Sequence, residues 1–384
     1  MPNHPVILVH GIQGSWLKDQ YPVDYQDSIL WTGILKKNFA ALHLHALDST
    51  VDAEPKRMVF PHQAVPLIYE SLVDEVRDEL AEQHPYVYMF TYDWRKDNRQ
   101  AAEELGRFMD RVLRIAAVHE RAAGRTAPRK VSLIGHSMGG LVIKWYATQL
   151  LGPTRAKQTI ERILTIATPF GGSLKAVEAL LPGARNLFGM ENQKSMRHAA
   201  RTMPGLYQLL PAWKEAVVRL NDHEPLDVFD EKSWQENLVA ALKERFGTPA
   251  FFRNMLADAK KFSAVVSKPW PAALRGRVWT AFGVETDTWW QVPVDTSRQN
   301  FFHFDKVRYG GAVENWREGD GTVHVTSSYD STLARTHRFS DKEEFKDKLA
   351  GHHANMPNHG GVQDWVLGVL KLNEHVDAAF DSPR

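Results

Sequence analysis

The stretch that decides the fold is VSLIGHSMGGLVIKWYA, residues 131–147. The run Val131–Ile134 is typical of a short buried strand, and the run Leu141–Ala147 has helical spacing. Between them stands G-x-S-x-G, centred on Ser137. A sharp strand-to-helix turn lifts a serine hydroxyl clear of the backbone, and its crowding requires glycine on both sides. The stretch therefore predicts a nucleophilic serine; a merely structural glycine-rich turn is the alternative.

Length and composition limit the domain organisation and the class of protein that the chain can be. A chain of 384 residues exceeds the usual size of one hydrophobic core, so we expect one large domain with insertions or two domains. The hydrophobic share of 43%, the charged share of 24% and a mean hydropathy of −0.38 are ordinary for a globular protein. A net charge of +1 argues against nucleic acid or an anionic membrane held by bulk charge.

Two absences in the sequence exclude further classes. The lack of cysteine rules out disulfides, thiolate metal sites and a cysteine nucleophile. No basic segment followed by a long apolar stretch opens the chain, and no run of about 20 apolar residues occurs in it. We therefore expect no signal peptide, no transmembrane helix and a cytoplasmic location, unless this is a mature form or another export route operates.

The order of apolar patterns predicts an α/β fold. Strands are expected at 6–9, 86–90, 131–134, 160–167 and 277–283, and helices at 66–82, 101–121 and 362–372. Strands that alternate with helices imply a mainly parallel sheet flanked by helices. Residues 174–273 break this alternation, with helical patterns rich in Met, Trp, Leu and Phe. We interpret them as an inserted helical cap or lid on a core of residues 1–173 and 274–384; helices simply packed on the sheet are the alternative.

A serine nucleophile needs a base, and the base needs an orienting acid. On a sheet of this kind the chain order is serine, acid, histidine. Asp320 is the best acid, because the glycines on both sides suit a tight turn that aims a carboxylate inward; an ordinary Asp-Gly turn is the alternative. Asp287, Asp295 and Asp305 fit less well, since they lie among aromatic-rich strands or a hairpin.

The base is expected to be a histidine, because its ordinary pKa of about 6.5 lets it take and return a proton near neutrality. A loop just before the last predicted helix can reach over the carboxyl edge of the sheet. We favour His353 in that loop, with His359 second and His352 third. His324 and His337 are expected to be solvated strand histidines.

The oxyanion formed by attack needs two backbone N–H donors, each worth roughly 3–4 kcal/mol of the barrier. Met138 directly follows the nucleophile, and Ile12 lies in the turn after the first strand, where Gly11 permits a close approach. The neighbouring residues are the candidates for substrate binding, although His10 is expected to be a scaffold residue and not a second base: His10, Gln13, His136 and Phe170.

Several motifs together resemble a known superfamily. They are His-Gly at 10–11, YDWR at 92–95, GHSMG at 135–139, TPFGG at 168–172, MPGLYQLLP at 203–211 and GDGTV at 319–323. The chain resembles the α/β-hydrolases and, more narrowly, bacterial lipases and relatives of lecithin–cholesterol acyltransferase. YDWR is the most family-specific motif, and the set spans nearly the whole chain.

The resemblance implies an α/β-hydrolase core with a cap and gives Ser137, Asp320 and His353 the triad positions. It places Ile12 and Met138 at the oxyanion. Asp93 and Arg95 are interpreted as a structural charge pair that braces the loop after its strand.

We expect a serine esterase or lipase that cleaves carboxylic, lipid-type esters through an acyl-enzyme on Ser137. An O-acyltransferase that passes the acyl group to a lipid or sterol is the runner-up. A non-catalytic binding protein on the same fold is the alternative of another class, and a peptidase or thioesterase is a further one.

The cap aromatics Trp213, Trp234 and Phe251–Phe252 could line an acyl pocket or touch a lipid surface, or they could form the core of the cap itself. Some bacterial lipases carry zinc or calcium. Here His43, His45 and the histidines around His353 lack an accompanying carboxylate pattern, so no metal and no cofactor are expected.

Overall fold

The computed structural model describes residues 4–20, 29–32, 38–80, 86–181, 193–246, 250–284, 286–305, 308–309, 312–313, 315–339 and 351–371. Its centre is a six-stranded sheet in the order β16-β9-β7-β6-β1-β5, in which every neighbouring pair is parallel. This confirms the predicted α/β class with a mainly parallel sheet. The strands are β1 (Val6–Val9), β5 (Val87–Phe90), β6 (Val131–His136), β7 (Ile160–Ile166), β9 (Val278–Gly283) and β16 (Thr336–Phe339).

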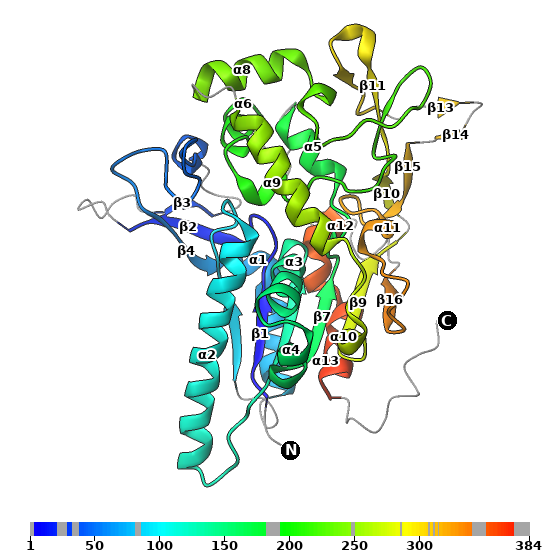
Figure 1. Ribbon diagram of the computed structural model, residues 1–384. Helices are drawn as coiled ribbons and strands as arrows, with labels where there is room; N and C mark the ends of the chain where they lie inside the picture. The colour runs from blue at the N-terminus through cyan, green and yellow to red at the C-terminus, as the bar shows by residue number, and fades with distance from the viewer. Residues whose placement is uncertain are drawn as a thin grey trace.

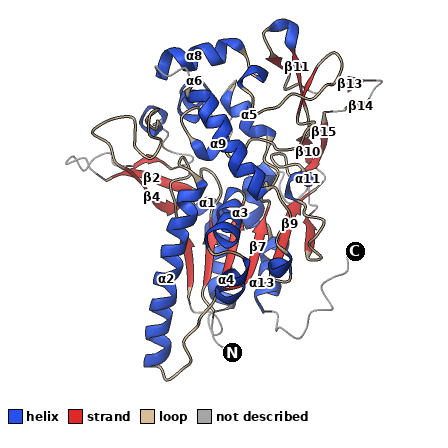
Figure 2. Ribbon diagram, in the orientation of Figure 1, coloured by secondary structure: helices blue, strands red, loops and turns tan. Residues whose placement is uncertain are grey.

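Helices cover both faces of the sheet (Figure 2), which explains why the inner strands β1 and β7 are buried along their whole length. Ile7 and Val9 face the layer of α2 and α3, whereas Val6 and Leu8 face α1 and α13. The helix predicted at 101–121 begins earlier, because the Asp97 side chain accepts from the Arg99 N–H and caps it. The bounds are α1 (Pro66–Glu79), α2 (Asn98–Ala122), α3 (Met138–Trp145) and α13 (Gly360–Lys371).

A second layer lies over the carboxyl ends of the strands, at the top of Figure 1. It holds the helices of segment 174–273 together with short strands from both inside and outside that segment. β8 pairs parallel with β11, which pairs antiparallel with β12. The division into core and cap, and any movement of the cap as a lid, stay predictions. The elements are α5 (Leu174–Leu180), α6 (Gln193–Ala200), α7 (Pro204–Tyr207), β8 (Val217–Arg219), α8 (Glu236–Phe246), α9 (Phe251–Val266), β11 (Val292–Asp295) and β12 (Phe301–Phe302).

The cap aromatics form the interior of this layer. Trp234, Phe251 and Phe252 are buried, and the Trp234 and Phe252 rings meet edge to face at 5.4 Å. Trp213 is half-buried, and its Nε1–H donates to the Trp290 carbonyl at 3.0 Å. The reading of Trp234, Phe251 and Phe252 as the core of the cap therefore fits better than that of a lipid-facing surface.

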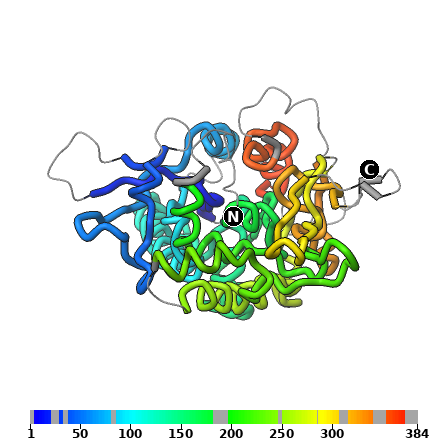
Figure 3. The backbone as a smooth tube through the Cα atoms, turned by 90° about the horizontal axis from the view of Figure 1, so that it is seen from above, coloured from blue at the N-terminus to red at the C-terminus, as the bar shows by residue number. Residues whose placement is uncertain are grey.

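Two smaller sheets flank the second layer. Seen from above (Figure 3), the blue segment with β2, β3 and β4 lies on one side and the yellow-orange segment with β10 and β15 on the other. β10 pairs antiparallel with β15, and β15 leads directly into Asp320. The strands of these two sheets are β2 (Ser15–Asp19), β3 (Ile29–Trp31), β4 (Val59–Ala64), β10 (Thr286–Trp289) and β15 (Trp316–Gly319). A separate antiparallel pair is formed by β13 (Arg308–Tyr309) and β14 (Ala312–Val313).

The remaining helices are short. No helix in the described ranges is long and apolar enough to cross a membrane. They are η1 (Phe39–Leu42), η2 (Tyr146–Leu150), α4 (Pro153–Thr159), η3 (Glu231–Ser233), α10 (Ala272–Arg275), η4 (Thr296–Arg298), α11 (Val325–Ser328), α12 (Gly351–Asn355) and η5 (Met356–Asn358).

Candidate active site

Ser137 lies at the turn between β6 and α3 in a strained conformation, with φ +53° and ψ −127°. Close packing makes glycine necessary beside it. A Cβ on Gly139 would lie 2.2 Å from the Val9 carbonyl oxygen, and one on Gly135 would lie 2.7 Å from Gly140 Cα. The turn therefore raises the hydroxyl at the carboxyl edge of the sheet, as the G-x-S-x-G pattern predicts.

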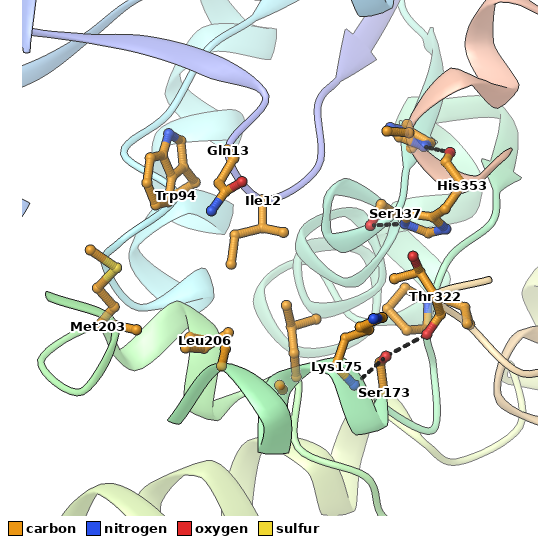
Figure 4. A pocket seen from close by; sticks show the side chains of 18 of the residues that line it. Ile12, Gln13, Trp94, Ser137, Ser173, Lys175, Met203, Leu206, Thr322 and His353 are labelled. Atoms are coloured by element: carbon orange, nitrogen blue, oxygen red, sulfur yellow. Dashed lines mark hydrogen bonds between the residues drawn. The ribbon is translucent and has the colours of Figure 1, made fainter. Parts of the chain in front are cut away.

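Ser137, His353 and Asp320 form a hydrogen-bonded chain, of which Figure 4 shows the link between Ser137 and His353. His353 Nε2 lies 2.9 Å from Ser137 Oγ, and His353 Nδ1 lies 2.6 Å from Asp320 Oδ2. The other Asp320 oxygen accepts from the backbone N–H groups of Thr322 (2.9 Å) and Val323 (2.7 Å). An acid held in this way orients the ring so that Nδ1 carries the proton and Nε2 can accept one from the serine.

The other candidate acids and bases lie elsewhere. Asp295 caps a 3-10 helix, and His324 caps α11 by accepting from the Thr326 N–H at 3.2 Å. His337 and His359 both lie against Phe339, with ring centroids 4.5 Å and 5.6 Å from it. The side chain of His352 lies outside the described residues. Asp287 and Asp305 are both exposed.

The loop after β1 approaches the nucleophile closely: a Cβ on Gly11 would lie 2.8 Å from Ser137 Cβ. The Gly11 carbonyl accepts from His10 Nδ1 at 2.7 Å and from the Gly14 N–H at 3.1 Å. Because N–H and C=O point in opposite directions across a trans peptide, the Ile12 N–H is turned away from these two donors. This geometry suits the predicted oxyanion role of Ile12.

Met138 is the first residue of α3, so its N–H has no acceptor within the helix. The start of a helix also carries partial positive charge, which favours an oxyanion beside Ser137. The roles of Met138 and Ile12 as donors stay predictions.

Two histidines beside the site are buried and neutral. Burial lowers the pKa of His10 to about 4, although its bond to the Gly11 carbonyl acts in the opposite direction. Burial lowers the pKa of His136 to about 3, and the neighbouring His353 adds to the effect. A pKa this low means that neither ring carries charge near neutral pH.

A cavity of about 370 Å³ opens over Ser137 and His353. Figure 4 shows Met203 and Leu206 at one end of it and Ser173, Lys175 and Thr322 at the other. The polar end is tied to the acid loop, because Ser173 Oγ donates to the Thr322 carbonyl at 2.5 Å. The apolar wall consists of Phe39, Leu42, Met196, Ala200, Met203 and Leu206.

Of the four predicted substrate-binding residues, Gln13 and His136 line the cavity. His10 does not: it is fully buried and stacks on Tyr92 with ring centroids 4.3 Å apart. Phe170 also lies outside the cavity wall, since it packs edge-on against Trp270 and under the Lys144 ammonium. Both predictions are wrong, because the residues are near the motifs in sequence whereas the fold turns their rings away from the cavity.

Other cavity residues carry no sequence pattern that marks them. Tyr69 from α1 and Lys175 from α5 line the cavity. Each belongs to a helix with both apolar and polar residues, where a polar side chain is common and therefore does not indicate a site. In the described part of the chain no group of three or more His, Asp or Glu side chains could hold a metal ion.

Comparison with known proteins gives one family. The family described as "Lecithin:cholesterol acyltransferase" matches residues 63–363, more than half of the chain. Two Arabidopsis thaliana proteins are similar in sequence. Phospholipase A(1) LCAT3 is 28% identical over 130 residues, which cover 32% of this chain and 27% of that protein. Lecithin-cholesterol acyltransferase-like 4 is 24% identical over 340 residues, which cover 80% of this chain and 60% of that protein.

The chain therefore spans less than two thirds of either plant relative. Among solved structures, the crystal structure of the Tle4-Tli4 complex matches with a TM-score of 0.63 and 16% identity, over 96% of this chain and 98% of that chain. At this identity the likeness concerns the fold alone.

Proposed function

The chain belongs to the lecithin:cholesterol acyltransferase family, and on that premise we propose that it is a serine hydrolase of lipid esters. The observation that carries the proposal is the hydrogen-bonded chain of Ser137, His353 and Asp320 beneath a cavity with a largely apolar wall. A mere likeness of fold would not require these three groups to meet.

The first half of the reaction forms an acyl-enzyme. Ser137 Oγ attacks the ester carbonyl while His353 Nε2 takes its proton, and Asp320 stabilises the resulting imidazolium. The Ile12 and Met138 N–H groups stabilise the oxyanion of the tetrahedral intermediate. When that intermediate collapses, the C–O bond to the alcohol breaks and His353 returns the proton to the leaving oxygen.

The second half removes the acyl group. Water enters beside His353, gives it a proton and attacks the acyl carbonyl; collapse returns the proton to Ser137 Oγ and releases the acid. Membership of an acyltransferase family favours a second candidate, in which a lipid alcohol replaces the water. Both reactions share every residue of the site and differ only in the acceptor.

The substrate is proposed to be a long-chain acyl ester, with a phospholipid as the leading case because one plant relative is named a phospholipase. The apolar wall suits an acyl chain. At the polar end, the Lys175 ammonium lies 3.1 Å from Glu178 Oε2 and over the Trp289 ring at 4.2 Å. Its charge suits a phosphate beside the scissile ester.

Contact with a lipid surface is part of the proposal, but the cap is not its best-supported site. No large hydrophobic side chain in the described part of 174–273 is exposed. Four of the nine exposed large hydrophobic side chains in the described part of the chain lie instead in the stretch that runs from η1 into β4, and η1 also supplies Phe39 and Leu42 to the cavity. They are Leu47, Val51, Met58 and Phe60. We propose this group, here called the 47–60 patch, as the lipid-facing surface.

The decisive experiment is labelling with a fluorophosphonate serine probe. Wild type is expected to be labelled and to hydrolyse long-chain esters, and Ser137→Ala is expected to lose both activities. Labelling that survives the substitution would refute the nucleophile. Adding a sterol or lysolipid acceptor then separates the two candidates, because exclusive hydrolysis across all acceptors excludes acyl transfer.

A further inference from the structure

We propose that Tyr69 is a positioning residue, which ties the loop of the oxyanion donor Ile12 to the backbone of the base His353 by way of His136. The inference rests on the proposed function and adds a residue to its machinery. Tyr69 comes from α1, outside every motif of the site.

Three consecutive hydrogen bonds make the connection. The Gly11 N–H donates to Tyr69 Oη at 2.9 Å, and Tyr69 Oη lies 2.8 Å from His136 Nδ1. His136 Nε2 lies 3.1 Å from the His353 carbonyl oxygen. Tyr69 is 3% exposed and His136 is 5% exposed, so water competes little for these groups.

The chemistry of the two ends fixes the direction of every bond. A backbone N–H only donates, so Tyr69 Oη accepts from Gly11 and has its own proton left for His136 Nδ1. A carbonyl only accepts, so His136 Nε2 must carry the ring proton toward His353. One tautomer of neutral His136 satisfies all three bonds, and its pKa of about 3, lowered chiefly by burial, keeps the ring neutral.

The connection joins parts that must act together. Gly11 immediately precedes Ile12, whose N–H serves the oxyanion. The carbonyl that accepts from His136 belongs to His353, the same residue whose ring is the base. The Gly11 carbonyl accepts from His10 Nδ1 and the Gly14 N–H, which belong to the same loop, and His10 Nε2 accepts from the Tyr92 N–H after β5; none of these bonds reaches His353. The hydroxyl of Tyr69 connects this loop to the residue that carries the base. The distance between the Ile12 N–H and the His353 ring therefore stays constant as the oxyanion forms.

Replacing the hydroxyl alone is feasible, because the ring has its own packing. It meets His136 edge to face with centroids 5.6 Å apart and lies 6.4 Å from His10. Tyr69→Phe therefore keeps the ring and removes the centre of the connection. It leaves the Gly11 N–H and His136 Nδ1 buried without their partner.

The test measures kcat per active site titrated with a fluorophosphonate, on a soluble ester. Tyr69→Phe is expected to lower kcat by about 10- to 100-fold, with KM changed by less than about 3-fold, because misplaced groups act on the transition state. The matched control is Tyr207→Phe, another buried tyrosine, whose hydroxyl donates to the Arg201 carbonyl at 3.0 Å. Its kcat per titrated site should stay within about 2-fold of wild type.

A double-mutant cycle with His136→Phe gives the second measurement; kcat is again taken per titrated active site, so that misfolded molecules in a poorly folding variant are not counted. Since both substitutions break the same connection, the double variant should be scarcely slower than either single variant. Additive losses, or a Tyr69→Phe enzyme as fast as Tyr207→Phe, would overturn the inference. Wild type without labelling or esterase activity would instead overturn the proposed function, so the two failures are distinguishable.

Discussion

Ser137 has a backbone conformation that L-residues rarely adopt, and such a conformation costs on the order of 1–3 kcal/mol. Two backbone bonds hold it: the Ser137 N–H donates to the Ile166 carbonyl at 2.8 Å, and the Ser137 carbonyl accepts from the Gly140 N–H at 3.1 Å. Ile166 belongs to β7 and Gly140 to α3, and both residues are buried. The strained conformation of Ser137 is therefore held by rigid, buried elements. The reactive hydroxyl is thus fixed before substrate arrives.

At this scale, the assignment of the base can be tested by comparing two histidines. His353→Ala should lower kcat by about 10³-fold or more, because Ser137 loses its proton acceptor. Asp320→Asn should lower it by a similar or larger factor by disturbing the Nδ1–H tautomer. His359→Ala is the control and should change kcat by less than about 3-fold, measured per titrated site. A larger loss in His359→Ala than in His353→Ala would reverse the assignment.

Sequence predicts the residues of this site unevenly, for a physical reason. Ser137 and Asp320 stand in turns whose flanking glycines are demanded by sterics, so a local pattern reveals them. Tyr69 meets His136 across 67 positions, and nothing local marks such a contact. For His10 the motif predicts both substrate binding and a scaffold role; the scaffold role agrees with the structure, where its ring donates to the Gly11 carbonyl.

Among the elements, the segment after β5 is fixed by a buried ion pair of the kind that YDWR predicts. The fully buried Arg95 guanidinium donates from Nη2 to Asp93 Oδ2 at 2.7 Å and lies 2.9 Å from Asp52 Oδ1. It also donates to the Leu42 carbonyl at 3.2 Å. One side chain therefore joins the end of β5, the end of η1 and the loop before β4, and so shapes the cavity wall at Leu42.

Arg95→Ala should destabilise the protein by about 3–5 kcal/mol, since it leaves Asp93 and Asp52 buried without their cation. The measurement is the free energy of unfolding in urea near pH 7. Arg77→Ala is the matched control, because the Arg77–Asp74 pair on α1 is exposed; it should cost less than about 0.5 kcal/mol. Equal losses in the two variants would contradict the bracing role of Arg95.

The 47–60 patch makes a second prediction at this scale. Leu47 is 75% exposed and Val51 is 51% exposed, so replacing both with serine removes apolar surface without opening the core. The double variant should bind phospholipid vesicles on the order of 100-fold more weakly, since burying two aliphatic side chains is worth about 3 kcal/mol. Its activity on a soluble short-chain ester should be unchanged.

The matched control for the patch is a double replacement elsewhere, Val118→Ser with Leu150→Ser, because both side chains are also exposed. Vesicle binding of this control should equal that of wild type. If both double variants bind equally weakly, the effect is nonspecific and the patch has no special role.

Elements were predictable where one face is buried over several turns or along a whole strand. The strands β1, β6, β7 and β9 lie where their largely apolar patterns predict them, because both faces of the sheet are covered. The short strand β8 escaped prediction: Val217–Arg219 carries too few residues for a period, and its place is set by pairing with β11, far along the chain.

For the whole molecule, the parallel sheet explains how distant residues meet. Ile12 follows β1, Ser137 follows β6 and Asp320 follows β15, and the adjacent carboxyl ends of β1 and β6 bring the first two together. His353 then arrives on α12, next to the helix that closes the opposite face. The site needs the complete sheet, so global stability and activity should be lost together.

Because the buried histidines are neutral, the free energy of unfolding depends on pH. His10 has a folded-state pKa of about 4 and His136 one of about 3, against about 6.5 for an unfolded histidine. Between these values the unfolded chain binds more protons than the folded one, so the free energy of unfolding must fall as the pH falls. From pH 7.5 to pH 5.0 each ring should cost on the order of 2 kcal/mol, a range that lies above the ordinary pKa of carboxylates. Urea unfolding at the two pH values measures the loss. Because burial also lowers the pKa of His43 and of His324 to about 4, a slope reduced by about a quarter in His136→Phe would assign its share. A stability that is flat or higher at pH 5.0 would show that these rings are protonated in the folded protein.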